Sequence, residues 1–166
     1  MTTLIDSFKN LLSRVVTLEN NPGGGGGSST AGLHTVPISA GSMVPSASNG
    51  CSALANIATA TNQPDVLTLN FHQSTQQHCQ FSIPFPKRWN KGTITARFRW
   101  SHPTTSVNYG VVWGIQAVAV GDNDAINTAY GTAGEITDVG SSANKLFVSP
   151  ITSAITIAGT PVDGDT

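Results

Sequence analysis

The stretch GTITARFRW, residues 92–100, alternates polar and apolar side chains at every position after its glycine. The apolar members are Ile94, Ala96, Phe98 and Trp100, and the polar members are Thr93, Thr95, Arg97 and Arg99. Successive side chains of a β-strand point to opposite faces of its sheet, so this period of two places the apolar residues on one face. The stretch therefore predicts a strand that is buried on one face and solvated on the other.

Segments on either side of this strand extend the β pattern. DVLTLNFH (residues 65–72) and HCQFSIPFP (residues 78–86) also alternate, YGVVWGIQAVAVG (residues 109–121) is a longer and more fully apolar run, and AITIAG (residues 154–159) closes the series. β-Branched and aromatic residues are frequent in these segments, and Gly, Pro and Asn separate them. Residues 65–166 are therefore predicted to form an antiparallel β-sandwich of the jelly-roll type, with one helical turn at DAINTAYGTA, residues 124–133.

The first 21 residues have a different pattern. Apolar residues recur there at alternating spacings of four and three, at Leu4, Phe8, Leu11, Val15 and Leu18. This spacing predicts a helix with a coiled-coil seam that ends before Pro22, because a residue before proline is disfavoured in the helical conformation. An isolated helix of this length is marginal in water. We expect it to be an oligomerisation or docking anchor, and its wide apolar stripe favours three or more helices.

The anchor is separated from the β region by two polar segments. Residues 22–32 contain five consecutive glycines, Gly23, Gly24, Gly25, Gly26 and Gly27, which predict a flexible hinge. Residues 33–64 are poor in charge and rich in Ser, Thr, Ala and Gly, and we expect an extended arm or edge strand there, with partial disorder as the alternative. The predicted order is thus anchor, hinge, arm and β-sandwich head.

The composition restricts the function classes. Only 10% of the residues are charged and the net charge is −1, so no basic stripe is available to neutralise nucleic-acid phosphates. No apolar run approaches the roughly 18 residues that a membrane span requires, and the N-terminal residues lack the charged and apolar regions of a secretory signal. Cys51 and Cys79 could pair, but without a sign of secretion two buried or half-buried thiols are the favoured interpretation.

Residues for catalysis are scarce. The chain has two glutamates, Glu19 and Glu135, of which only Glu135 has an acidic neighbour in the β region, Asp138. A glycosidase needs two carboxylates that face each other, but a solvated turn is the favoured interpretation of GEITDVG, residues 134–140. No nucleophile elbow, zinc-protease motif or phosphate-binding loop is present. We therefore expect no enzymatic activity and no catalytic residue.

The metal-binding residue types also lack a motif. His72, His78, Cys79, His102 and Cys51 do not have zinc-site spacing, so structural or surface roles are favoured for them. Asp122 and Asp124 resemble the start of a calcium loop but lack its glycine and late glutamate, and a turn is favoured there. We expect neither a metal nor another cofactor.

The aromatic residues offer a weak candidate for a glycan site. Trp100 and Trp113 lie in strand patterns and are expected in the core, whereas Trp89 lies in the basic group PKRWNK, residues 86–91. An exposed aromatic ring beside polar groups is suited to sugars. Trp89, Arg88 and Tyr109 are the candidate glycan contacts, and the alternative for the basic group is a solvated turn or a contact with an acidic neighbour.

Four motifs together resemble a known family. They are PKRWNKGTITARFRW (residues 86–100), GVVWGIQAVAV followed by Asp-x-Asp (residues 110–124), AYGTAGEITD (residues 129–138) and SPITSAITIAGTP (residues 149–161). In this order they resemble a β-rich domain that recurs in virion proteins of tailed bacteriophages. The resemblance covers residues 81–161, about half of the chain.

The resemblance implies a virion structural protein, such as a trimeric head fibre, decoration protein or tail appendage. Such a protein is assembled in the host cytoplasm, and its partners are its own copies and other capsid or tail proteins. The alternative function is a receptor-binding protein for host surface polysaccharide. The family pattern has further strands after residue 161, so we expect either a fragment or a sandwich that is completed differently, for example by a neighbouring subunit.

Overall fold

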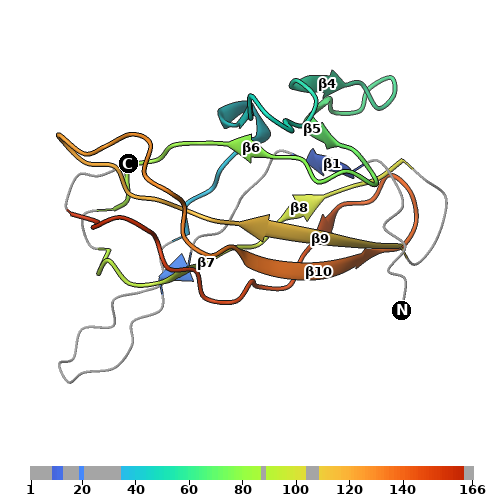
Figure 1. The fold of residues 1–166 in the computed structure, drawn as a ribbon. Helices are drawn as coiled ribbons and strands as arrows, with labels where there is room; N and C mark the ends of the chain where they lie inside the picture. The colour runs from blue at the N-terminus through green and yellow to red at the C-terminus, as the bar shows by residue number, and fades with distance from the viewer. Residues whose placement is uncertain (1–8, 13–18, 21–34, 87–88, 104–108, 163–166) are drawn as a thin grey trace.

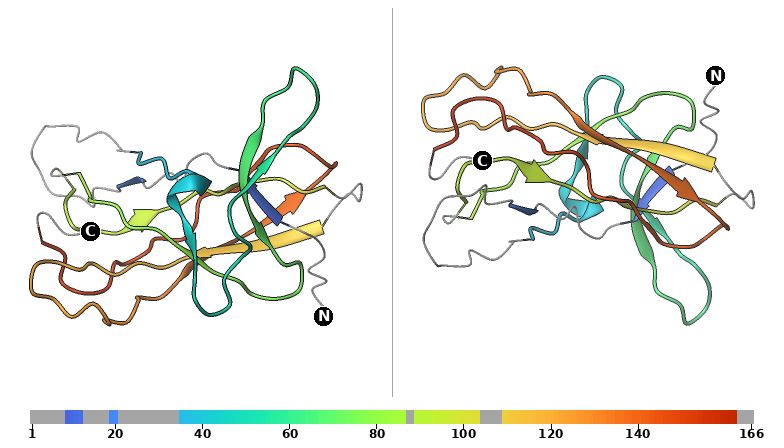
Figure 2. Two further views of the ribbon diagram at one scale, coloured as in Figure 1. Left: turned by 90° about the horizontal axis from the view of Figure 1, so that it is seen from above. Right: turned by 90° about the horizontal axis from the view of Figure 1, so that it is seen from below.

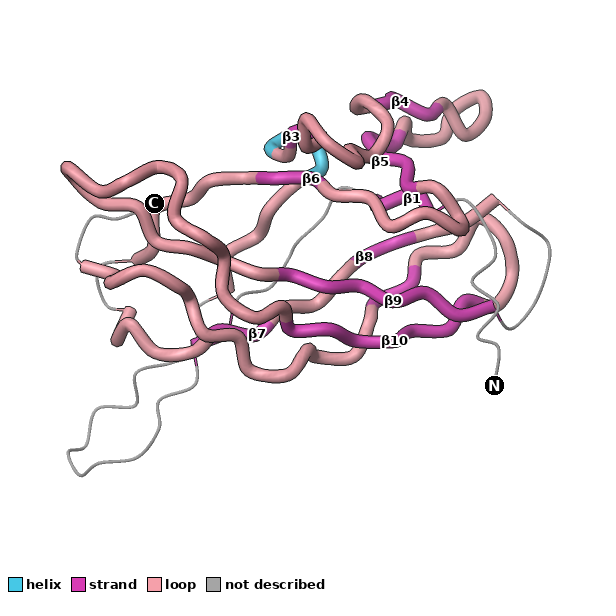
Figure 3. Tube along the Cα trace, in the orientation of Figure 1, coloured by secondary structure: helices cyan, strands magenta, loops and turns pink. Residues whose placement is uncertain are grey.

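The computed structural model describes residues 9–12, 19–20, 35–86, 89–103 and 109–162, and over these residues the protein is mainly β (Figure 1). Short strands are joined by long loops (Figure 3). The elements are β1 Lys9–Leu12, β2 Glu19–Asn20, the single 3-10 turn η1 Ala40–Ser42, β3 Val44–Pro45, β4 Ala55–Ile57, β5 Val66–Phe71, β6 Cys79–Gln80, β7 Ile94–Thr95, β8 Arg99–Trp100, β9 Tyr109–Ile115, β10 Gly134–Gly140 and β11 Phe147–Val148. The described strands form small antiparallel sheets in the orders β1-β5-β4, β10-β9, β11-β8, β2-β7 and β3-β6.

The alternation predicted for residues 92–100 is confirmed by the burial of the side chains. Its four apolar side chains, Ile94, Ala96, Phe98 and Trp100, are all buried, but its polar side chains at positions 93, 95, 97 and 99 are half-buried, so the predicted solvated face is wrong. The hydrogen-bond ladder, however, is interrupted between β7 and β8, so the stretch forms two short strands in place of one. The cause lies in its partner, residues 147–155.

The partner segment contains two residues too many for a regular ladder. Phe147 pairs with Trp100 and Ile155 pairs with Ile94, so eight residue steps on one chain face six on the other. Two positions between these pairs are therefore bulged, which bends a strand and locally breaks its ladder. The bulges coincide with the sequence SPITS, residues 149–153.

Two buried hydroxyl groups replace the backbone acceptors that are missing from the interrupted ladder. The N–H of Phe98 donates to Ser149 Oγ at 2.9 Å, and the N–H of Ala96 donates to Thr152 Oγ1 at 3.0 Å. In return, the backbone N–H groups of Ser149 and Thr152 donate to the carbonyl oxygens of Phe98 and Ala96. Because buried backbone donors need partners, these two side chains allow the segment to cross the core despite its extra residues.

The longest strand pair is β9 with β10, which runs in register from Gly134 opposite Ile115 to Gly140 opposite Tyr109 (Figure 1). β10 replaces the solvated turn that the sequence analysis favoured for residues 134–140, so that prediction is wrong. Alternate residues of β10 are more buried, starting and ending with a glycine. The strand therefore turns one face inward despite its two acidic residues.

The core is dominated by aromatic rings. Trp113 lies edge-on to Phe71 at 5.5 Å between ring centroids and stacks on Phe98 at 5.6 Å, while Trp100 lies 4.9 Å from Phe147. His102 stacks on Phe147 at 5.4 Å, so it is a core residue. We call Phe71, Phe98, Trp100, His102, Trp113 and Phe147 the aromatic cluster. The prediction that Trp100 and Trp113 are core residues is confirmed.

The helical anchor predicted for residues 1–21 is wrong where the structure describes the chain. Residues 9–12 form β1, which pairs with β5 and places Leu11 opposite Leu69, and residues 19–20 form β2, which pairs with β7. Apolar spacing over so short a segment is a weak determinant, and strands with unpaired backbone groups attract an extended chain. The other seam residues, Leu4, Phe8, Val15 and Leu18, and the hinge at residues 22–32 lie outside the described residues.

The segment predicted as an extended arm, residues 33–64, contributes to the core from residue 35 onward. Ile38, Ala40, Met43 and Cys51 are buried with the core residues of the strands. β3 pairs with β6, and β4 pairs with β5. Figure 2 shows the β4–β5 connection projecting from the rest of the molecule. The structure thus joins residues 35–57 to strands that lie later in the chain.

The hydrogen bond from the Ala96 N–H to Thr152 Oγ1 predicts a loss of stability when the hydroxyl is removed. Thr152→Val keeps the shape of the side chain but leaves the buried N–H of Ala96 without its acceptor, which costs about 1–3 kcal/mol. The free energy of unfolding in urea should fall by that amount. Thr156→Val, at an exposed position of the same segment, is the matched control and should change it by less than about 0.5 kcal/mol. Equal effects of the two variants would show that the hydroxyl has no such role.

Candidate functional site

The two acidic residues considered for catalysis do not face each other. Glu135 and Asp138 are three residues apart in β10, so their side chains leave opposite faces of the strand. Glu135 is exposed, whereas the half-buried Asp138 accepts the indole N–H of Trp100 at Oδ2, at 2.7 Å. Asp138 Oδ1 also accepts the backbone N–H of Val139 at 2.9 Å. Asp138 is thus engaged in structural hydrogen bonds.

The residues considered for metal binding are dispersed. Within the part of the chain that the structure describes, no three His, Cys, Asp or Glu side chains come together as a metal site would require. Asp124 accepts the N–H of Gly121 at Oδ2, at 2.9 Å, and returns a backbone hydrogen bond to the Gly121 carbonyl. Asn123 between them has a φ of 65°. These bonds confirm the predicted turn at residues 121–124.

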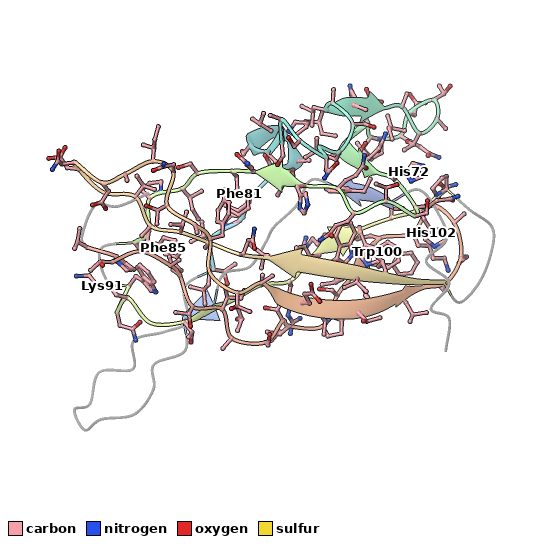
Figure 4. The ribbon with its side chains drawn as sticks, viewed as in Figure 1. His72, Phe81, Phe85, Lys91, Trp100 and His102 are labelled. Carbon is pink, nitrogen blue, oxygen red and sulfur yellow. The ribbon has the colours of Figure 1, made fainter. Side chains whose placement is uncertain are left out.

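The three residues named as glycan contacts are not gathered at one place. Trp89 is half-buried and stacks on Phe85, with ring centroids 4.3 Å apart, and Phe85 lies at one end of the molecule (Figure 4). Tyr109 pairs with Gly140, which packs against Trp100 and His102 toward the other end. Arg88 and the side chain of Tyr109 lie outside what the structure describes.

An exposed apolar strip lies on the bulged segment. The strip consists of Leu146, Val148, Pro150 and Ile151, all of which are exposed, and Val148 retains 46% of its accessible surface. The neighbouring residues Phe147, Ser149 and Thr152 point inward and hold the segment in place. Because the bulge lies after Ser149, Pro150 and Ile151 are both exposed, and the simple alternation is lost. That loss of phase explains why the sequence analysis did not identify the strip.

A second exposed feature is the loop between β9 and β10, which projects at the left end of Figure 1. Ile126 in this loop is 91% exposed and Tyr130 is 48% exposed. A turn at residues 125–128, closed by hydrogen bonds from the backbone and side chain of Thr128 to the Ala125 carbonyl, replaces the predicted helical turn. The loop therefore displays an aromatic ring near amide and hydroxyl groups. Tyr130 is not among the candidate glycan contacts named from the sequence.

Three sulfur atoms gather where the segment of residues 35–57 meets β6. The Sγ of Cys79 lies 3.6 Å from the Sδ of the buried Met43, and Cys51 is also buried. Burial, followed by the proximity of Cys51, raises the pKa of the Cys79 thiol to about 12. Burial likewise raises the pKa of Cys51. Both groups are therefore protonated thiols at neutral pH, which are poor nucleophiles.

Comparisons with known proteins add no assignment. No family model, curated protein or solved structure matches the chain. In the described part of the chain, no helical segment has the length and apolar character needed to cross a bilayer.

Proposed function

We propose that this protein is a structural component of a bacteriophage virion and that the apolar strip is a contact between its copies. The proposal includes a jelly-roll-like β-sandwich, of which the observed small antiparallel sheets would be parts. Its support from sequence is the ordered set of four motifs between residues 86 and 161. Its support from the structure is the strip itself, which is the observation that carries the proposal.

The strip is suited to association because its residues are apolar, lie close together in sequence, and belong to a segment that hydrogen bonds hold in place. Full burial of a Val, Leu or Ile side chain contributes about 1.5–3 kcal/mol, so three copies of the strip meeting around an axis would add a substantial stabilisation. Hydroxyl hydrogen bonds to Phe98 and Ala96 fix the segment that presents it. With charged residues making up 10% of the chain, few charges are available to oppose close packing of copies.

The proposed partners are therefore other copies in a homotrimer and other capsid or tail proteins, in a head fibre, decoration protein or spike assembled in the host cytoplasm. Attachment through an N-terminal helix is not part of the proposal, because β1 and β2 are strands.

The oligomeric state tests this function. Val148→Asp places a charge in the middle of the strip and should convert a trimer to monomers in sedimentation velocity, with an unchanged circular dichroism spectrum. The matched control is Val112→Asp, at a position of β9 that is 42% exposed and lies outside the strip, and it should remain a trimer. A monomeric parent protein, or a Val148→Asp variant that remains trimeric, would contradict the proposal.

A second candidate function, binding of host surface polysaccharide, is favoured by the β9–β10 loop. Sugar-binding surfaces combine an exposed aromatic ring with nearby amides and hydroxyls. Tyr130 supplies the ring, and Asn127 and Thr128 supply exposed polar groups in the same loop. This loop replaces Trp89 as the proposed glycan contact, because Trp89 is half-buried against Phe85.

The glycan function predicts that Tyr130→Ala weakens binding to isolated host polysaccharide by roughly two- to tenfold, since stacked aromatic contacts contribute about 0.5–1.5 kcal/mol. Trp89→Phe, which keeps a ring on Phe85, is the control and should bind like the parent protein. Titration calorimetry with purified polysaccharide measures both. Absence of binding by the parent protein removes this candidate and leaves the structural function unaffected.

A further inference from the structure

Cys51 and Cys79 are distant in sequence, and each follows a residue of a parallel β-bridge. Gly50 and His78 form a parallel bridge, in which the N–H of His78 donates to the Asn49 carbonyl at 2.8 Å and the N–H of Cys51 donates to the His78 carbonyl at 3.1 Å. Parallel chains advance in the same direction, so the residues that directly follow this bridge on its two chains are Cys51 and Cys79. Neighbouring strands lie about 4.8 Å apart, which is within the range of about 4.4–6.8 Å between the Cα atoms of a disulfide.

The proximity of Cys51 contributes to the raised pKa of the Cys79 thiol, as expected for cysteines on neighbouring segments. Cys51 is buried, whereas Cys79 is only half-buried and borders the buried thioether of Met43. Cys79 is therefore the less buried residue of the two, and its sulfur packs against Met43.

We propose that Cys51 and Cys79 form an intramolecular disulfide when the protein meets an oxidising solution. A small-molecule disulfide such as oxidised glutathione is the oxidant. Cys79 loses its proton and attacks one sulfur of the reagent, which breaks the reagent's S–S bond and releases one small thiol. Cys51 then loses its proton and attacks Cys79 Sγ in the mixed disulfide, which releases the second small thiol. The two protons end on the two released thiols, and the two protein thiols are oxidised as the reagent disulfide is reduced.

The bond would link the segment of residues 35–57 to β6 covalently. In the described structure these parts are joined by non-covalent contacts, which include the pairing of β3 with β6, the bridge at Gly50 and the contact of Cys79 with Met43. A disulfide limits the conformations of the unfolded chain, and the loop closed here contains β4 and β5. The protein would thus be more stable in an oxidising solution than in a reducing one. This inference does not depend on the proposed virion function.

Refolding in a redox buffer tests the proposal without requiring a reagent to enter the folded core. The reduced, urea-unfolded full chain is diluted into about pH 8 buffer with reduced and oxidised glutathione, and the monomer is analysed by intact mass and by thiol titration in denaturant. We expect the loss of two hydrogens, no free thiol, and a peptide that contains Cys51 linked to Cys79. The Tm should exceed that of the reduced protein by roughly 5–10 °C, for a loop of this length.

Two variants separate this outcome from others. Cys51→Ser and Cys79→Ser should each end with the remaining cysteine as a free thiol or as a mixed disulfide with glutathione, and neither should show the loss of two hydrogens. A parent protein that refolds with both thiols free, or that forms disulfides only between chains, overturns the proposal. If a variant fails to refold, the mass, the thiol titre and the linked peptide of the refolded parent protein decide the outcome alone.

Discussion

The hydrogen bond between the Trp100 indole and the Asp138 carboxylate is the interaction around which the described structure is organised. Trp100 is fully buried in the aromatic cluster, and its N–H donates to Asp138 Oδ2 at 2.7 Å. A buried N–H without a partner is costly, so β10 must bring an acceptor to this point. The close approach of β10 depends on Gly140, where an added Cβ would lie 2.8 Å from atoms of both Trp100 and His102.

The packing of the same core also determines which apolar residues are exposed on the surface. Trp100 is fixed on its other side by Phe147, and the segment that follows Phe147 must cross the core with two extra residues. The buried hydroxyls of Thr152 and Ser149 accept the backbone N–H groups of Ala96 and Phe98 along this segment. The resulting bulge exposes Pro150 and Ile151 together. The proposed contact between copies is thus a consequence of how the core is closed, which links the packing to the function we propose.

The sequence correctly predicts segments in which apolar side chains recur at every second position. The alternation of residues 92–100 and the strand at Val66–Phe71 are present, and Trp100 and Trp113 are in the core. β10 is not predicted from the sequence, because acidic residues and glycines are typical of a solvated turn. Its half-buried Asp138 finds a partner, Trp100, only in the tertiary structure. The N-terminal segment was assigned the wrong structure because pairing with β5 and β7 overrides a short heptad pattern. The strip and the exposure of Tyr130 depend on a bulge and a loop conformation, which composition and period do not encode.

A double-mutant cycle on Trp100 and Asp138 tests this account most directly. The free energies of unfolding of the parent protein, Trp100→Phe, Asp138→Ala and the double variant give the coupling energy of the pair, because the packing loss of each single variant cancels. A hydrogen bond to a charged group predicts a coupling of about 1.5–3 kcal/mol. A coupling below about 0.5 kcal/mol would contradict the central place of this bond in the fold.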